Sequence, residues 1–328
     1  MYHSRWKKTH REAGYIYGSR LLKKGIKLDF QSMLNQDRID YAKAVYPIYK
    51  KYYPEILEEM EGFVEGQGSS IECIYPFLVT MYSFTLNNYC SMVAFKNDNN
   101  YIFARNSDFL IEVEKLSDSP FYNLDSSYAF IGNTTALMEI EDGINEKGLA
   151  CGLTFIYPTT KGLGLNAGFL VRYILEKCET VDQAINFLNS VPIGSAQCLL
   201  IADRFNNIVE CELNPNNKCI VRKQNLGFKA NHFIEKDMAE YVYDGEDDIF
   251  SHQRYEVIKK QDFLKYDLNS TFDLMKGKYG FMCQYDRKKG MDTIWSSVFD
   301  IKNKVIYRCE GNPSRKKFII DKRLKFTY

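Results

Sequence analysis

The stretch from Cys90 to Phe109, CSMVAFKNDNNYIFARNSDF, decides our interpretation of the fold. Two short apolar segments, SMVAF and YIFAR, flank the polar segment KNDNN, and this pattern is typical of a β-hairpin. In a hairpin with a short turn, a residue that opens the first strand lies near the end of the second strand. We therefore expect Cys90 to lie close to Arg105 and Asp108.

Helical and extended patterns alternate along the rest of the chain. From Asp29 to about Gly66, apolar residues recur at three- and four-residue steps, which predicts helices that Pro47 and Pro54 break or kink. Strand patterns follow at 128–131, 136–140 and 149–155, and helical patterns follow at about 167–177 and 181–188. The rest of the chain predicts a three-stranded meander at 198–223, a helix from near Ser251, and a closing hairpin at 293–311. This order predicts an α+β fold in which antiparallel sheets form a sandwich between two helical layers.

The bulk composition excludes several classes of protein. The chain has 328 residues, of which 45% are hydrophobic, and this is enough for a large core in one domain or two. Its 43 basic and 42 acidic residues do not form the positive clusters of a nucleic-acid-binding protein. The sequence lacks a secretory signal pattern and an apolar run of about 20 residues, so we expect a cytoplasmic protein. The nine cysteines include no C-x-x-C motif, so the sequence indicates neither a zinc site nor a redox dithiol.

The residues alone leave two interpretations of the hairpin open. A cysteine at the start of an apolar strand is most often a buried core residue, and an Arg–Asp pair is most often a weak surface ion pair. The same residues also suit catalysis, because an arginine beside Cys90 favours the reactive thiolate, and an aspartate orients that arginine or holds an amine. Catalysis by a cysteine also needs a base.

Two candidates for that base remain open as well. His232, in the segment ANHF, could act as the histidine does in papain-like cysteine proteases. Alternatively, cleavage of the Tyr89–Cys90 bond would free the α-amine of Cys90, whose ordinary pKa of about 7.7–8.0 suits a general base. The second mechanism needs no histidine, and the sequence has only four of them.

The stretch that opens at Cys90 resembles the nucleophile hairpin of N-terminal-nucleophile (Ntn) hydrolases. The resemblance is closest to the penicillin acyl-CoA acyltransferase (isopenicillin N acyltransferase) family, which is related to choloylglycine (bile salt) hydrolases. The segment RNSDF at 105–109 is its most specific motif. Further segments resemble family motifs in the same order: GINEKGLACGL at 143–153, ANHF at 230–233, SHQRY at 251–255 and TIWSSVFDIKNKVIYRCEGNP at 293–313.

The resemblance implies a four-layer αββα sandwich and an autocatalytic cut between Tyr89 and Cys90. Residues 1–89 would then be a helical pro-segment, and residues 90–328 would be the catalytic domain. Tyr89 departs from the family pattern, in which a small glycine commonly precedes the nucleophile. Bile salt hydrolases lose only an initiator methionine, whereas 89 residues precede this cysteine, which argues against a direct assignment to them.

The resemblance also implies a role for each site residue. Cys90 is the nucleophile, and Arg105 and Asp108 line its pocket and orient its amine. The backbone N–H of Asn145 and the side chain of Asn231 donate to the oxyanion hole. Arg254 is a second arginine near the nucleophile. Ordinary structural interpretations of these three, as a turn residue, a loop residue and a solvated helix residue, also stay open.

These expectations combine into a function. The chain is expected to be an autoproteolytic cysteine amide hydrolase or acyltransferase that acts on linear amide C–N bonds through an S-acyl-Cys90 intermediate. The alternatives are a papain-like cysteine protease that uses His232 and a non-enzymatic binding protein on a hydrolase scaffold. Neither a metal nor a cofactor is expected, although acyl-CoA could be a co-substrate. The expected partner is a small-molecule amide or acyl substrate, neither a nucleic acid nor a membrane, and a homo-oligomer stays open.

Overall fold

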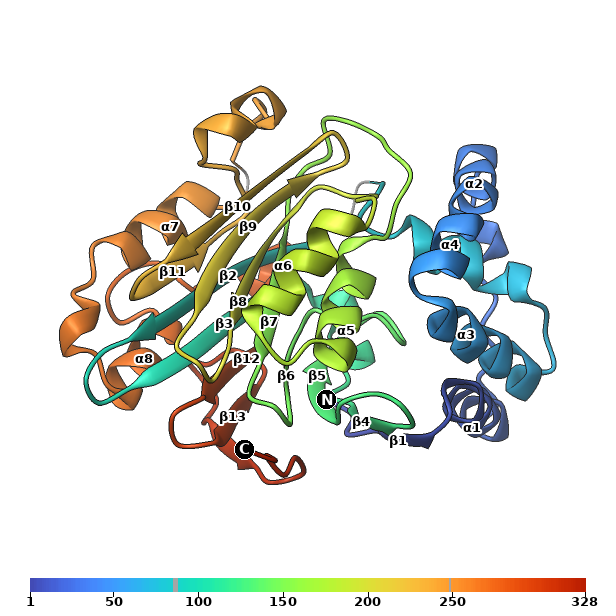
Figure 1. Cartoon of the computed structure of the whole chain (residues 1–328), viewed down its shortest axis with the longest axis horizontal. Coiled ribbons are helices and arrows are strands. Elements are labelled where there is room, and N and C mark those ends of the chain that lie inside the picture. Colours follow the sequence, from blue (N-terminus) through green and yellow to red (C-terminus); the bar gives the residue numbers. More distant parts are fainter. Residues whose placement is uncertain (85–87, 248) are drawn as a thin grey trace.

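The computed structural model describes residues 1–84, 88–247 and 249–328, and within these residues two β-sheets pack face to face between helices (Figure 1). The larger sheet has the strand order β1-β4-β5-β6-β7-β8-β9-β10: Arg5–Lys8, Phe121–Leu124, Phe130–Asn133, Asp142–Asn145, Ala150–Phe155, Gln197–Ala202, Ile208–Asn214 and Asn217–Lys223. The smaller sheet has the order β11-β2-β3-β12-β13-β14: Leu226–Lys229, Asn88–Lys96, Tyr101–Leu110, Met291–Asp300, Val305–Glu310 and Ile319–Asp321. Paired strands are antiparallel except β1 and β4, so the predicted α+β sandwich is confirmed.

Helices cover both outer faces of the sandwich. Helix α5 (Ala167–Lys177) packs on β6 and β7 of the larger sheet and is followed by α6 (Val181–Ser190). Helices α7 (Ser251–Lys259) and α8 (Leu268–Met275) pack on β2 and β3 of the smaller sheet. The order of the layers is therefore helix, sheet, sheet, helix, as the resemblance implied.

The β2–β3 hairpin lies inside the smaller sheet, and the hairpin that the sequence predicts is confirmed. Cys90 pairs with Ser107, and the polar residues 97–100 connect the strands. Side chains alternate between the two faces of a strand. Met92 and Ala94 pack between the sheets, whereas Val93 packs toward the helical layer of α7 and α8. Cys90, two residues before Met92, therefore faces the space between the sheets.

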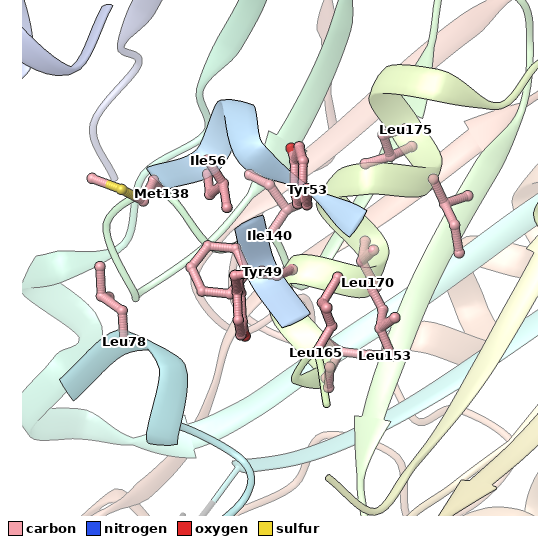
Figure 2. Packing of buried hydrophobic residues seen from close by; sticks show 14 of the residues in the cluster. Tyr49, Tyr53, Ile56, Leu78, Met138, Ile140, Leu153, Leu165, Leu170 and Leu175 are labelled. Atoms are coloured by element: carbon pink, nitrogen blue, oxygen red, sulfur yellow. The ribbon is translucent and has the colours of Figure 1, made fainter. Parts of the chain in front are cut away.

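Four helices precede the hairpin: α1 (His10–Lys23), α2 (Gln36–Tyr52), α3 (Pro54–Gln67) and α4 (Tyr75–Thr80). They form a group on one side of the sandwich (Figure 1). Tyr49, Tyr53 and Ile56 share one hydrophobic cluster with Leu170 and Leu175 of α5 (Figure 2). The N-terminal helices are therefore packed onto the body of the protein through a common core.

Glycines allow α1 and α3 to lie in direct backbone contact. A Cβ atom at Gly14 would lie 2.0 Å from the carbonyl oxygen of Glu59, and one at Gly62 would lie 2.0 Å from that of Arg11. Only glycine leaves room for so close an approach.

The structure also corrects the sequence analysis in places. Residues 1–23, for which the sequence analysis predicts no element, form β1 and α1, and β1 pairs with β4 of the larger sheet. The strand expected at 136–140 is absent from this described segment, because Leu137 has a φ of 57° and the Glu139 N–H turns back to the Ala136 carbonyl. Pro47 lies inside α2 without ending it, whereas the break predicted at Pro54 is confirmed, because α2 ends at Tyr52 and α3 begins at Pro54. Short 3₁₀ helices lie at Gln31–Met33, Ile71–Cys73, Ile111–Leu116, Lys236–Tyr241, Phe263–Lys265 and Arg287–Lys289.

Among the helices in the described part of the chain, none is both long and apolar enough to cross a bilayer.

Candidate active site

Cys90 lies near the start of β2 and is completely buried. Its Sγ accepts a hydrogen bond from Nη2 of Arg105, with 2.8 Å between the two atoms. Arg105 lies opposite Met92 in the ladder, so it and Cys90 share the face of the hairpin that points between the sheets. The hairpin therefore brings the guanidinium to the thiol, as the sequence predicts.

Arg105 is held by the larger sheet on its other sides. Nη1 donates to Asp142 at 2.8 Å, Nη2 donates to Glu141 at 3.2 Å, and Nε donates to the Leu153 carbonyl at 3.0 Å. All of these side chains are fully buried. The planar guanidinium suits such a set of fixed acceptors, because its N–H groups form a rigid fork. The nucleophile's arginine is therefore fixed by the opposing sheet.

The peptide groups around Cys90 are held from a different direction. The Cys90 N–H donates to Oδ1 of Asn231 at 2.8 Å, and the Cys90 carbonyl accepts from Nη1 of Arg254 at 2.5 Å. Nη2 of Arg254 also donates to Oδ1 of Asn231 at 2.8 Å. Asn231 and Arg254, separated from Cys90 by more than 140 residues, thus meet at the main chain of the nucleophile.

Asn231 presents its side-chain oxygen to the backbone N–H of Cys90. Its Nδ2 donates to the Phe155 carbonyl at 2.7 Å. In this uncut chain the side chain therefore acts as an acceptor for the nitrogen of Cys90, whereas the resemblance implied a donor to the oxyanion hole. The same oxygen is correctly placed to accept from the α-amine that a cut before Cys90 would create.

Asp108 lies on the opposite face of β3 from Arg105, because the two positions differ by three, an odd number. Its Oδ2 lies 3.7 Å from Nη1 of Arg254 and accepts from the Tyr285 hydroxyl at 3.1 Å, and its Oδ1 accepts from Thr293 at 2.5 Å. Burial raises the pKa of Asp108 to about 6, with Arg254 acting in the opposite direction. Asp108 therefore approaches Cys90 through Arg254, and Arg105 takes its carboxylate partners from β6 and the residue before it.

Asn145 lies away from this cluster. Its backbone N–H donates to the Leu149 carbonyl at 3.0 Å, and its side-chain oxygen accepts from the N–H groups of Lys147 and Leu149 at the turn between β6 and β7. Its Nδ2 donates to the carbonyl of Leu175 within α5 and to that of Cys178 directly after α5. In this structure the Asn145 N–H serves the turn, and the oxyanion role that the resemblance implies stays a prediction.

His232 is paired with a serine. Ser251 Oγ accepts from the Asn231 N–H at 2.7 Å and lies 2.7 Å from Nδ1 of His232. The ring of His232 stacks on that of His252, with 4.0 Å between the centroids. Burial, followed by the nearby His252, lowers the pKa of His232 to about 3. The imidazole is therefore neutral at ordinary pH and supports the loop that carries Asn231.

The thiol itself is in its neutral form in this arrangement. Burial raises the pKa of Cys90 to about 12, although Arg105 acts against this effect. A thiol of this kind needs a base close by before it can attack a carbonyl. Within the described residues we find no cluster of three His, Cys, Asp or Glu side chains that could hold a metal ion.

The sequence analysis missed Glu141 and Asp142, although they directly precede the motif at 143–153. Asp142 accepts not only from Arg105 but also from Asn133, Trp295 and Ser297. Two adjacent acids within an apolar strand pattern were the available signal, because buried carboxylates need charged or hydrogen-bonded partners.

A buried cysteine near the start of a central strand, with its thiol on a guanidinium and its sheet inside an αββα sandwich, defines the class of Ntn cysteine hydrolases. The family model for acyl-coenzyme A:6-aminopenicillanic acid acyl-transferase matches residues 95–315, which is more than half of the chain. The chain therefore belongs to this family, as the motifs suggested. It is accordingly an enzyme of the group that hydrolyses amides or transfers acyl groups.

Several solved structures resemble the chain. Penicillin V acylase from Agrobacterium tumefaciens is 16% identical over 67% of this chain and 82% of its own, with a TM-score of 0.45. A mutant of conjugated bile acid hydrolase from Clostridium perfringens is 13% identical over 72% of this chain and 98% of its own, with a TM-score of 0.49. The Caenorhabditis elegans orthologue of N-acylethanolamine-hydrolyzing acid amidase is 13% identical over 65% and 93%, with a TM-score of 0.47. No curated protein sequence matches the chain.

Proposed function

We propose that this protein is activated by cutting its own Tyr89–Cys90 bond and then hydrolyses amides, or transfers their acyl groups, through Cys90. Residues 1–89 would become a small chain, and residues 90–328 would form the catalytic chain with Cys90 at its N-terminus. The proposed chemistry uses only side chains and the new amine, without a metal or cofactor. An acyl-CoA thioester would be an alternative acyl donor.

The self-cleavage would proceed in two balanced steps. Sγ of Cys90 attacks the Tyr89 carbonyl, the C–N bond breaks, and the proton of the thiol ends on the released α-amine. Water then hydrolyses the thioester, which gives a carboxylate on Tyr89 and restores the thiol. Arg254 and Asn231 support the step because they hold the carbonyl and the nitrogen of Cys90, and so limit the orientations of the reacting bond.

Turnover would repeat this chemistry on a substrate. The α-amine, with an ordinary pKa near 8, takes the proton of the thiol as Sγ attacks the substrate carbonyl. The leaving amine departs with a proton, and the acyl group stays on Sγ. Attack by water then completes hydrolysis, whereas attack by another amine completes transfer.

The observation that carries this proposal is the set of contacts on Cys90: Arg105 on its thiol, Asn231 on its nitrogen and Arg254 on its carbonyl. A structural cysteine needs none of them. The papain-like alternative has less support, because Nδ1 of His232 is engaged with Ser251 and the thiol's contact is with Arg105.

Intact-mass spectrometry tests the proposal directly. We expect purified wild-type protein to consist of two fragments that meet at Tyr89/Cys90, and Cys90→Ala to remain a single chain. His232→Ala should still be cut, whereas a papain-like enzyme would lose its activity. An uncut wild-type chain, or a cut Cys90→Ala chain, would contradict the proposal.

Substrate classes can be tested with the same method. Penicillin V, a conjugated bile acid and an N-acylethanolamine represent the compounds in the names of the similar structures. We expect a substrate of the enzyme to leave its acyl mass on the fragment that begins at Cys90. The control is the same fragment after reaction with iodoacetamide, which should block the addition.

A further inference from the structure

Glu141 lies beside the nucleophile and is completely buried. Its Oε2 accepts from Nη2 of Arg105 and from Oγ of Ser107, both at 3.2 Å. The same Nη2 donates to Sγ of Cys90, and Ser107 pairs with Cys90 across the β2–β3 ladder. The carboxylate is therefore separated from the sulfur by a single donor group.

The position of this carboxylate is fixed from its other end. Oε1 of Glu141 accepts from the backbone N–H of Thr135 at 3.2 Å and from its hydroxyl at 3.0 Å. Donors thus reach both oxygens, an arrangement that suits a charged carboxylate. Glu141 is consequently a fixed negative charge next to the place where the acyl group would be attached.

Among the described residues, the charged groups at Cys90 and its two arginines leave no surplus positive charge. Two buried guanidinium groups face three buried carboxyl groups: Arg105 and Arg254 against Asp108, Glu141 and Asp142. A further carboxylate in this dry environment would lack a counter-ion, and its burial would be costly. Without Glu141, in contrast, Nη2 of Arg105 would have room for such a partner.

We propose that Glu141 makes the site selective for amides of uncharged acyl groups, because it occupies Arg105 and repels an acyl group that carries a carboxylate close to the scissile carbonyl. The inference rests on the proposed function, since it requires the acyl group to be attached to Cys90. Glu141 acts through Arg105 and through its charge, and is therefore a positioning residue that determines specificity.

The test compares three amides of 7-amino-4-methylcoumarin that have acyl groups of equal shape: succinamoyl, succinyl and 4-methylpentanoyl. Succinamoyl and succinyl differ in charge alone, and 4-methylpentanoyl reports on apolar preference. We expect wild-type kcat/KM to be at least about tenfold higher for succinamoyl than for succinyl, since like charges a few ångströms apart repel strongly in a buried site. A wild-type ratio near one would overturn the inference even if no variant can be prepared.

Glu141→Gln removes the charge and keeps the shape. We expect it to lower the succinamoyl-to-succinyl ratio by about tenfold, whatever its effect on the absolute rates. Glu139→Gln is the control for the same substitution at a neighbouring buried glutamate: Glu139 is also fully buried, accepts from Asn166, and has no bond to Arg105 among its described contacts, so its ratio should stay at the wild-type value. An unchanged ratio in Glu141→Gln, or an equal change in Glu139→Gln, would overturn the inference. If the wild-type protein shows neither turnover nor acylation of Cys90 with any of the amides, this result would instead contradict the proposed function.

Discussion

Arg105 and Arg172 are two fully buried arginines with nearly the same surroundings. Each donates to two carboxylates and one backbone carbonyl and lies near an aromatic ring. The partners of Arg105 are Glu141, Asp142, the Leu153 carbonyl and Trp295. Those of Arg172 are Glu176, Glu59, the Met138 carbonyl and Tyr122. The same arrangement thus occurs twice in one chain.

What separates the two clusters is the remaining partner. Arg105 also donates to the thiol of Cys90, so one of its N–H groups is shared between structure and chemistry. The described hydrogen bonds of Arg172 include no thiol, and the carboxylate of Glu176 takes as further donors the Tyr53 hydroxyl at 2.6 Å and His10 at 3.0 Å. A buried arginine with a complete set of structural partners stabilises the fold, whereas one that also contacts a nucleophile adjusts its reactivity.

The Arg172 cluster also joins two parts of the chain. His10, Tyr53 and Glu59 precede the proposed cut, whereas Arg172 and Glu176 belong to α5. After a cut at Tyr89, this cluster would connect the small chain to the catalytic chain. The comparison therefore predicts that substitutions in one cluster change the stability of the assembly, and that substitutions in the other change its chemistry.

The largest effect is expected from Arg172→Met, measured in a Cys90→Ala background that keeps the chain in one covalent form. The substitution leaves Glu59 buried without its guanidinium partner and leaves His10 as the remaining cationic partner of Glu176, so the free energy of unfolding should fall by about 3–5 kcal/mol. Urea denaturation followed by circular dichroism measures this change. Arg11→Met is the matched control, because Arg11 also pairs with two glutamates but lies about half exposed; it should change the stability by about 1 kcal/mol or less. Equal losses in the two variants would contradict the comparison.

Arg105→Lys should have the next largest effect, on activity. A lysine ammonium keeps the charge but cannot serve the thiol, both carboxylates and the Leu153 carbonyl in one fixed geometry. We expect kcat/KM to fall by roughly a hundredfold, or about 2.7 kcal/mol of transition-state stabilisation. For Arg172→Lys we expect kcat/KM, expressed per titrated Cys90 thiol, to stay within about threefold of the wild type, because Arg172 stabilises the fold and does not adjust the reactivity of the thiol. A comparable loss in Arg172→Lys would show that the two clusters do not have different roles.

The local part of the site could be predicted from the sequence. The hairpin register depends on alternation and on a short polar turn, and these place Cys90 opposite Ser107 with Arg105 on the same face. Alternation also places Arg105 and Asp108 on opposite faces of β3, because their positions differ by three. Asp108 accordingly meets Arg254, and not Arg105.

The distant part of the site could not be derived from residue patterns. Glu141 and Asp142 reach Arg105 because two sheets stack face to face, and the choice of facing strands depends on packing that no local pattern describes. Asn231 and Arg254 came from the family resemblance and do meet at Cys90, whereas Asn145 came from the same source and serves a turn. Motif likeness therefore located Asn231 and Arg254 at the nucleophile, and the catalytic roles that it implies stay predictions.

Tyr53→Phe tests whether the hydroxyl groups of the Arg172 cluster contribute to it. The Tyr53 hydroxyl donates to Glu176 at 2.6 Å, so its removal should lower the free energy of unfolding by about 2 kcal/mol, as is typical of a hydrogen bond to a charged group. Tyr122→Phe is the control, because the Tyr122 hydroxyl lies 3.4 Å from Glu59 and should contribute less than about 1 kcal/mol. Urea denaturation in the Cys90→Ala background measures both. A larger loss for Tyr122→Phe would contradict the proposed division within the cluster.

The smallest effect is expected from His10→Gln, and its sign depends on pH. Burial alone would lower the pKa of His10, but the charge of Glu176 and its hydrogen bond outweigh burial and raise this pKa above its ordinary value. The pKa of Glu176 is lowered, so its carboxylate stays charged in mild acid. The ion pair is therefore fully present below about pH 6.5 and is lost as the pH rises through the raised pKa of His10. We expect the stability difference between wild type and His10→Gln to be largest at about pH 5.5 and to shrink by about 1 kcal/mol towards about pH 9.

His3→Gln removes an imidazole that is 41% exposed beside Glu310 and should show almost no such trend. A difference that grows with pH would mean that His10 does not carry its charge within the cluster.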